Sequence, residues 1–459
     1  MIPLLVENAL VIGMTCPADV TPEGALFVED GVISALHSEA HARARALERG
    51  GELVERLNVE GLWVTPGFVQ AHIHLCQTLL RNGPDDLELL PWLRGHVWPG
   101  EAAHDEETME VSARLGLTEL LAGGTTALLD MGTVRHTDSI FRVAQEMGIR
   151  ITSGNALMDD PATNPAELCA PAEEGLAETE RLKKRWHGAA SGRLRVAWTP
   201  RFAPSCTDAL LREVGARAKA EGLLVHTHAS ENLGEVELVR QRTGRSNVGY
   251  LADVGIAGPN AVLAHVIHTD EAERELLASR GTAVVHCPTS NLKLSSGICP
   301  VPEYLSRGIR VALGADGAPC NDRLDIFSEM RLAALLPKVR LGPAALSAWE
   351  VVRMATAGGA ETLGLEREIG TLEVGKRADF VLLDPREGFA LPTVWRSDPY
   401  GPLVYSFDRG HVVATYVDGE ARFHRVRRSR QALSPPPEAV DAAVLKLSRK
   451  RSLANAPTK

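Results

Sequence analysis

The segment FVQAHIH, residues 68–74, is a short apolar run that ends in two histidines. Seven further apolar runs of similar length follow it along the chain, with helical patterns between them. Such alternation is typical of parallel β-strands that helices bury on both faces. The runs are FVQAHIH (68–74), TTALLDM (125–131), IRITSGN (149–155), LRVAWTP (194–200), LLVHTH (223–228), AVLAH (261–265), TAVVHC (282–287) and IRVALGAD (309–316).

The helical patterns include ETMEVSARLGLTELLA (107–122), DALLREVGARAKAE (208–221) and DEAERELLASR (270–280). A glycine follows each of them, as is common after a helix C-terminus. Eight β-α units is the number that closes a barrel, so we predict an α/β fold with a (β/α)8 TIM barrel over residues 64–364. A doubly wound sheet is the alternative, although no G-x-G-x-x-G motif follows the early runs.

The two ends of the chain resemble each other. ALFVEDGVISAL (25–36) and VVATYVDGEARFH (412–424) each place Asp-Gly between apolar runs, which is a hairpin signal. FVLLD (380–384) is a further strand candidate. We therefore expect residues 1–63 and 365–425 to form a small β-sandwich.

The composition bounds the class of protein. Of 459 residues, 44% are hydrophobic and 24% charged, which is typical of a globular protein and excludes disorder and collagen-like sequence. No apolar stretch approaches the length of a membrane span, and the N-terminus lacks the basic region of a signal peptide, so we expect a cytoplasmic protein without membrane contact. A net charge of −10 disfavours nucleic acid as a partner. Seven scattered cysteines without a C-x-x-C motif indicate reduced thiols.

The C-terminal segment is basic. Its last 39 residues hold ten Lys and Arg against two Asp and Glu, and SPPPE (434–438) lies within it. We interpret residues 426–459 as an arm that is either solvated or packed against another subunit, with an interaction arm as the alternative.

Several of the apolar runs end in residues that bind metals. His72 and His74 are two positions apart on one strand, so both imidazoles point to the same side. Active sites of barrel enzymes lie at this end of the strands. By spacing alone, either His226 or His228 supplies a third imidazole, and Asp316 supplies a carboxylate. His265 and His286 also end strands. Ligands of these types suit Zn, Fe, Co, Ni or Mn.

The motifs resemble those of the amidohydrolase superfamily, in its aminohydrolase branch. That branch contains guanine deaminase, the deaminases of methylthioadenosine, S-adenosylhomocysteine and 5'-deoxyadenosine, and the s-triazine hydrolases. The similar segments are VTPGFVQAHIHLCQTL (64–79), HTHASEN (226–232), LAHVIH (263–268), HCPTSNLKLSSG (286–297), LGADGAPCNDRLDIFSEMRLA (313–333) and GTLEVGKRADFVLLD (370–384).

The resemblance implies a role for each matching residue. Glu231 would be the acid that moves protons, and His265 would bind or orient the attacking water. Some relatives hold two metals through a Lys or Glu at the end of strand 4, where this chain has Arg201. Because a guanidinium cannot ligate a metal, we expect one divalent ion, zinc first and iron as the alternative. The implied ligands are His72, His74, His228 and Asp316.

The implied reaction is hydrolytic removal of ammonia from an aminopurine, with Glu231, His265 and Asp316 as catalytic groups. In guanine deaminases, a Gln after His-x-His and an Arg-Phe pair hold the purine, and this chain has Gln77, Arg201 and Phe202.

Trp92 is a second stacking candidate. Leu90 stands where the methylthioadenosine and S-adenosylhomocysteine enzymes have a ribose-binding Glu. We therefore expect guanine as substrate, with adenosine-type nucleosides as the alternative. Two more distant alternatives for the function are an s-triazine hydrolase and a non-catalytic scaffold. Relatives suggest a homo-oligomer, a dimer or tetramer.

Overall fold

The structure is a computed structural model that describes residues 2–387, 398–425 and 434–454. Clustering of contacts divides the chain into two compact units. The first unit comprises Met1–Gln70, Glu119–Ala127 and Asp325–Gln431, and the second Ala71–Thr118, Leu128–Leu324 and Ala432–Lys459. The domain boundaries expected from the sequence stay predictions.

The first unit contains a sheet of eight strands in the order β19-β18-β17-β5-β1-β2-β3, with β4 paired to β1. Strands from both ends of the chain therefore form one sheet, as the sequence predicts. Its strands are β1 (Leu4–Ile12), β2 (Val20–Glu29), β3 (Val32–Leu36), β4 (Glu55–Asn58), β5 (Trp63–Pro66), β17 (Phe380–Leu383), β18 (Val412–Val417) and β19 (Glu420–His424).

Both predicted hairpins are present. Asp30 and Gly31 join β2 to β3 with φ of 49° and 79°, and Asp418 and Gly419 join β18 to β19 with φ of 50° and 74°. Two successive positive φ values are those of a type I′ turn, whose twist matches that of the flanking strands.

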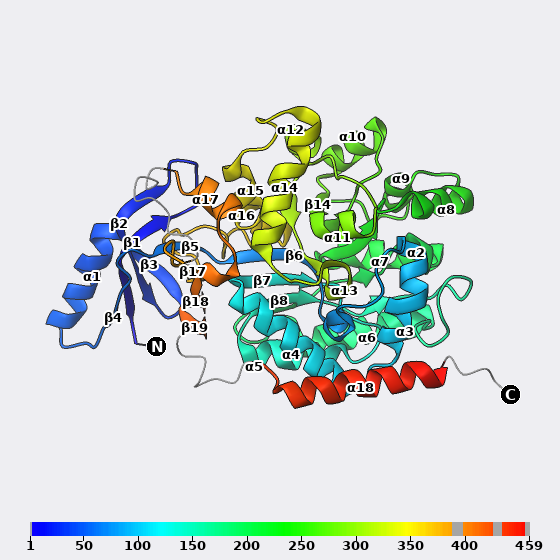
Figure 1. Ribbon diagram of the computed structural model, residues 1–459, viewed down its shortest axis with the longest axis horizontal. Helices are drawn as coiled ribbons and strands as arrows, with labels where there is room; N and C mark the ends of the chain where they lie inside the picture. The colour runs from blue at the N-terminus through cyan, green and yellow to red at the C-terminus, as the bar shows by residue number, and fades with distance from the viewer. Residues whose placement is uncertain (1, 388–397, 426–433, 455–459) are drawn as a thin grey trace. The chain divides into compact units, whose positions relative to one another are not determined.

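The two faces of this sheet bury different side chains. On one face, Leu5, Phe27 and Ala35 pack against Ala40 and Ala44 of α1 (His37–Arg49), the blue helix of Figure 1. The other face contributes to a larger apolar cluster with residues from β1, β2, β3, β5, β17 and β18. The other helices of this unit are α14 (Ile326–Leu341), α15 (Ala348–Met354), α16 (Ala357–Thr362), α17 (Tyr400–Tyr405) and η5 (Arg409–His411).

Each of the eight apolar runs forms β-structure, and two of the runs are interrupted. The strands are β6 (Phe68–His74), β7 (Thr125–Asp130), β8 (Arg150–Ser153), β10 (Leu194–Val196) with β11 (Thr199–Pro200), β12 (Val225–Ala229), β13 (Ala261–His265), β14 (Ala283–His286) and β15 (Val311–Leu313) with β16 (Asp316–Gly317). A short strand, β9 (Ala156–Leu157), follows β8.

Six of the pairs among these strands, β8 with β10, β9 with β11, β12 with β13, β13 with β14, β14 with β15 and β6 with β16, are parallel, as the sequence predicts. They form sheets of five strands (β10-β8-β7-β6-β16), four strands (β12-β13-β14-β15) and two strands (β11-β9). A bridge from Trp198 to Val225 connects the fourth run to β12. β16, the second strand of the eighth run, pairs with β6, so the last run lies beside the first.

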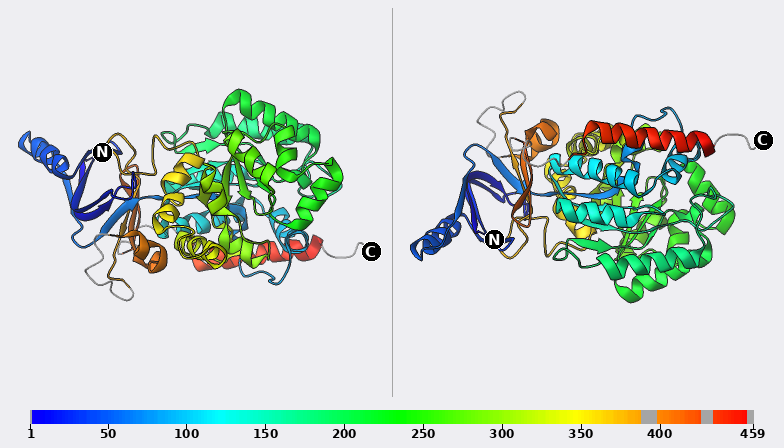
Figure 2. Two further views of the ribbon diagram at one scale, coloured as in Figure 1. Left: turned by 90° about the horizontal axis from the view of Figure 1, so that it is seen from above. Right: turned by 90° about the horizontal axis from the view of Figure 1, so that it is seen from below.

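Helices lie between successive strands and outside them (Figure 2). The helix at 107–122 begins one residue earlier than expected, and those at 208–221 and 271–280 match closely. The helices are η1 (Leu75–Leu80), α2 (Leu89–Trp92), η2 (Leu93–Val97), α3 (Trp98–Ala102), α4 (Glu106–Ala122), α5 (Thr137–Met147), α6 (Ala172–Trp186), η3 (Ala203–Ser205), α7 (Asp208–Glu221), α8 (Leu233–Thr243), α9 (Asn247–Asp253), α10 (Glu271–Arg280), α11 (Pro288–Lys293), α12 (Val301–Ser306), α13 (Ala318–Asn321) and α18 (Pro437–Ala454).

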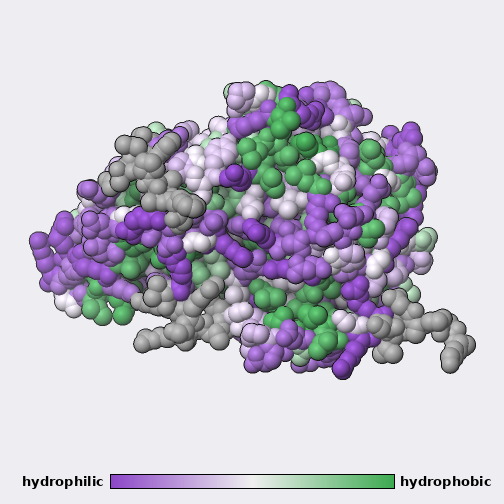
Figure 3. All heavy atoms as spheres, in the orientation of Figure 1, coloured by the Kyte–Doolittle hydropathy of each residue, from purple (hydrophilic) through white to green (hydrophobic). Residues whose placement is uncertain are grey.

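The described part of the basic C-terminal segment packs against its own chain, so the expectation of a solvated arm was wrong there. Packing against another subunit stays a prediction. Ala443 and Leu447 of α18 are buried against Leu79 and Leu80 of η1 and against Ala103. Figure 1 shows this helix in red beside α3. Its outer face mixes hydrophilic and apolar side chains (Figure 3). Residues 426–433 and 455–459 of the arm lie outside the described part.

All seven cysteines are free thiols, as their scattered spacing predicts. None of the described helices is both long enough and apolar enough to cross a lipid bilayer.

Candidate metal centre and substrate cavity

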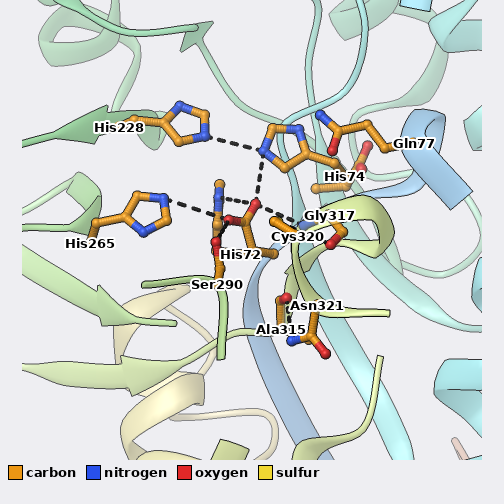
Figure 4. Close-up of polar contacts among 12 residues, drawn as sticks. His72, His74, Gln77, His228, His265, Ser290, Ala315, Gly317, Cys320 and Asn321 are labelled. Carbon is orange, nitrogen blue, oxygen red and sulfur yellow. Dashed lines mark hydrogen bonds and ion pairs between the residues drawn. The ribbon is translucent and has the colours of Figure 1, made fainter. Parts of the chain in front are cut away.

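The polar ends of four parallel strands meet at one edge of the second unit. His72 and His74 end β6, His228 lies near the end of β12, His265 ends β13, and Asp316 begins β16. All five side chains are largely buried. Figure 4 shows the four histidines gathered at one site, and the Asp316 carboxylate lies within 3.8 Å of His72, His74 and His265. The sequence predicted this set, and the structure brings its members together.

The distances fit a single ion. Asp316 Oδ1 lies 3.2 Å from His72 Nε2 and 3.3 Å from His74 Nε2, and His74 Nε2 lies 3.1 Å from His228 Nε2. Ligands about 2.0–2.1 Å from a tetrahedral ion are separated by about 3.3 Å, so these are the edge lengths of such a site. The ligand atoms of His72, His228, His265 and Asp316 also lie within 4.8 Å of one another.

The hydrogen bonds of His226 determine which nitrogen of His72 is free. His226 Nδ1 lies 3.0 Å from the Val262 carbonyl oxygen, which only accepts, so this nitrogen carries the hydrogen. His226 Nε2 then accepts from His72 Nδ1 at 2.7 Å. His72 Nε2 therefore carries no hydrogen, and its lone pair faces Asp316. His226, one of the two candidates for the third imidazole, orients His72 instead.

His228 and His265 are held in the same way. His228 Nδ1 donates to the Arg201 carbonyl oxygen at 2.6 Å, and His265 Nδ1 to Asn291 Oδ1 at 2.8 Å. Burial lowers the pKa of His72, His74 and His228, which keeps these imidazoles neutral. Lone pairs that converge in a buried site repel one another unless a cation lies between them. The donor set therefore fits a divalent metal.

Asp316 is fixed by its own neighbours. Ser290 Oγ donates to Oδ2 at 2.6 Å, and the Gly317 amide to Oδ1 at 2.7 Å. Asp316 and His265 also adopt left-handed backbone, with φ of 63° and 71°. For residues other than glycine this conformation is strained, and such strain gathers at functional sites.

Glu231 lies beside the cluster with the properties of an acid. Burial, with the nearby charges of Asp316 and Glu235, raises its pKa well above the usual range. Its Oε2 lies 3.6 Å from His265 Nε2. Glu235 accepts the backbone N–H of Glu231 at 2.8 Å and a hydrogen bond from Asn247 at 2.6 Å, which fixes this part of the chain. A carboxyl that is protonated near neutral pH can act as a general acid.

A cavity opens beside these groups. All four residues predicted to bind substrate line it, together with apolar residues from α2, η2 and the segment after α11. Apolar side chains and converging polar groups line it together, as in small-molecule sites. The lining residues are His74, Gln77, Leu89, Trp92, Leu93, Arg201, Phe202, His228, Glu231, His265, Leu294 and Asp316.

Arg201 does not present a free charge to this cavity. Its guanidinium donates to both carboxylate oxygens of Glu101 in α3, at 2.5 and 3.1 Å, and both side chains are buried. Gln77 Nε2 donates to the same carboxylate at 2.8 Å. The sequence analysis missed Glu101, because it lies outside the recognisable motifs and contacts Arg201 across 100 positions of the chain.

A second cluster, His74, Cys76 and Glu101, also brings candidate ligand atoms together. Burial raises the pKa of Cys76 well above its usual value, so its thiol stays protonated. Glu101 is already paired with Arg201, and His74 faces the first cluster. One metal ion stays a prediction.

The comparisons with known proteins agree with this geometry. The family model described as "Amidohydrolase family" matches residues 63–422 of this chain. A 5-methylthioadenosine/S-adenosylhomocysteine deaminase of Syntrophobacter fumaroxidans is 38% identical over 89% of this chain and 91% of its own. A 5'-deoxyadenosine deaminase of Methanothermobacter thermautotrophicus is 39% identical over 78% of this chain and 81% of its own.

Solved structures show the same fold. An adenosine deaminase from Xanthomonas campestris with bound zinc superposes with a TM-score of 0.87 at 31% identity, covering 98% of each chain. Guanine deaminase from E. coli gives 0.81 at 26% identity, covering 93% of this chain and all of the other. The chain thus belongs to the amidohydrolase family and is a hydrolase of carbon–nitrogen bonds, a deaminase.

Proposed function

We propose that this protein removes ammonia hydrolytically from a 6-aminopurine nucleoside of the 5'-deoxyadenosine, methylthioadenosine or S-adenosylhomocysteine type. The observation that carries the proposal is the buried cluster of four histidines and Asp316 beside Glu231, next to a cavity that apolar residues line in part. The names of the relatives at 38% and 39% identity support the nucleoside class.

In this proposal His72, His74, His228 and Asp316 hold one divalent metal, with zinc favoured by the Xanthomonas structure. When bound, such an ion makes water acidic enough to attack at neutral pH. We also propose that the eight runs close into a (β/α)8 barrel and that the eight-stranded sheet is a β-sandwich, because the last run lies beside the first and because the family's solved structures superpose over the whole chain.

The chain's own residues then move the protons. Asp316 and His265 accept a proton from the attacking water as its oxygen adds to C6 of the ring. Glu231, protonated because it is buried, gives its proton to the neighbouring ring nitrogen, so no negative charge accumulates on the ring. The proton left on the added oxygen then passes to Glu231, a proton from Asp316 or Glu231 reaches the amine, and ammonia leaves as the C6 carbonyl forms. Trp92 and Phe202 supply aromatic faces for the base.

The sequence analysis placed guanine ahead of adenosine-type nucleosides, and the comparisons favour the second. The structure supplies a physical reason. Guanine has a ring carbonyl that a free guanidinium would bind. The Arg201 guanidinium is instead paired with Glu101. The amide nitrogen of Gln77 likewise donates its hydrogen bond to Glu101 and not to a substrate. The homo-oligomer and the cytoplasmic location stay predictions.

The test is ammonia release by the zinc-loaded protein from a matched set of substrates. We expect turnover of at least one of 5'-deoxyadenosine, methylthioadenosine and S-adenosylhomocysteine, with kcat/KM at least tenfold above guanine and melamine. Preference for guanine would restore the first expectation. Absence of turnover of every aminopurine would contradict the proposal, and chloride release from a chlorotriazine would indicate a triazine hydrolase.

A further inference from the structure

Glu101 is a buried carboxylate beside the cavity without lining it. We propose that Glu101 is a positioning residue that turns the Gln77 carbonyl oxygen toward the substrate, so that the site binds an amine in preference to the carbonyl of the product. The inference rests on the proposed function and adds to it a means of discriminating substrate from product.

The orientation of the Gln77 amide follows from hydrogen-bond chemistry. Gln77 Nε2 lies 2.8 Å from Glu101 Oε1. An ionised carboxylate only accepts hydrogen bonds, so the amide nitrogen has to face it and the amide oxygen has to face away. Arg201 holds this carboxylate in place through two further hydrogen bonds. Reversing the Gln77 amide would set its oxygen against the carboxylate oxygen, which is repulsive.

The Gln77 oxygen is left for a ligand. Oε1 is buried and has no hydrogen-bond partner among the residues that the structure describes, although Gln77 lines the cavity. A buried acceptor without a partner is costly, so a group that donates to it gains free energy. The cost indicates that a bound molecule supplies the donor.

Gly317 provides the room for this oxygen. A Cβ atom at Gly317 would lie 1.9 Å from Gln77 Oε1. The backbone itself does not require glycine there, because its φ is −80°. Gly317 follows Asp316, which lies in the metal cluster, so the Gln77 oxygen is next to the reacting centre. Figure 4 shows Gln77 beside His74 on this side of the site.

The reaction changes the group that meets this oxygen. Before deamination, C6 of the base carries an amino group, which donates hydrogen bonds. Afterwards C6 carries a carbonyl oxygen, which accepts them. A fixed acceptor therefore favours the 6-amino substrate and the departing ammonia, and it disfavours the product. The arrangement limits product inhibition.

The test compares the product inhibition constant with the substrate KM in wild type and in Glu101→Gln. The variant keeps the side-chain shape but allows either end of Gln77 to face it, so the Gln77 nitrogen is free to bind the product carbonyl. We expect the ratio of product Ki to substrate KM to fall about tenfold. Glu271→Gln, which removes a carboxylate held by Arg307 far from the cavity, is the matched control and leaves the ratio unchanged.

A double variant, Gln77→Glu with Glu101→Gln, guards against misfolding of the single variant. It exchanges the amide and the carboxylate, keeps the net charge and restores an acceptor to the cavity. We expect its ratio to return to at least the wild-type value. A ratio unchanged in Glu101→Gln, or equally low in the double variant, would overturn the role of Glu101. Wild-type protein inactive on every 6-aminopurine nucleoside would instead overturn the proposed function.

Discussion

At the scale of single residues, the site depends on hydrogen bonds that fix imidazole tautomers. Val262 and Arg201 supply backbone carbonyls for this purpose, and Asn291 supplies a side-chain amide. The ligand candidates could be predicted from the sequence because they end strands in recognisable motifs. These supporting contacts could not, because they join strands whose neighbours only the fold determines.

Glu231 gives the most direct residue-scale prediction. Glu231→Gln removes the transferable proton but keeps the size of the side chain. We expect kcat to fall by about 100-fold or more, since general acid–base groups contribute on this order. Metal content should equal that of wild type, because Glu231 is outside the proposed ligand set. Steady-state ammonia release and elemental analysis of the same sample check both parts, and an unchanged rate would refute the assigned role.

At the scale of elements, the predicted strands were found within a few residues, because their apolar runs are short and bounded by turn signals. The prediction failed for α18, whose charge suggested a solvated arm. Its docking depends on a few apolar positions, among them Ala443 and Leu447, and on ion pairs from Lys446 and Lys450 to Asp105. The net charge of the segment does not reveal these apolar positions, because it counts only the charged residues around them.

Leu447 tests the docking of α18. The side chain is 3% exposed and packs against η1, the turn that carries Gln77. We expect Leu447→Ala to destabilise the docked helix by about 2 kcal/mol and to speed its amide hydrogen exchange. Leu445→Ala, at a residue on the same helix that is 57% exposed, is the matched control. Equal exchange in the two variants would show that burial of Leu447 does not hold the helix.

His104, just before α4, gives a pH-dependent prediction. Burial lowers its pKa from 6.5 to about 4, although the Cys76 carbonyl opposes this. The unfolded chain therefore binds one more proton than the folded one between these values. Neutral His104 therefore contributes fully to the free energy of unfolding above about pH 6.5, and this contribution is lost as the pH falls toward 4.

His104→Gln should therefore reduce the loss of stability between pH 7.5 and pH 5. Denaturant midpoints of wild type and variant at both pH values measure the difference. The partly exposed His41→Gln serves as control. A variant that loses as much stability as wild type over this range would show that His104 does not drive the acid sensitivity.

At the scale of the whole molecule, the order of the strands brings together residues that are far apart in the sequence. His72 and Asp316 are separated by most of the chain, yet they approach within 3.2 Å because β16 pairs with β6. The sequence predicts this meeting only through the count of eight β-α units. The substrate preference was harder to predict, because it depends on whether the Arg201 charge is free, and Glu101 decides that.

The central claim is that one divalent ion binds among His72, His74, His228 and Asp316. The direct measurement is elemental analysis of the purified protein after zinc loading and removal of unbound metal, beside Asp316→Ala treated identically. We expect about one zinc per chain in wild type and nearly none in the variant. Two ions per chain, none, or full occupancy in Asp316→Ala would contradict the account.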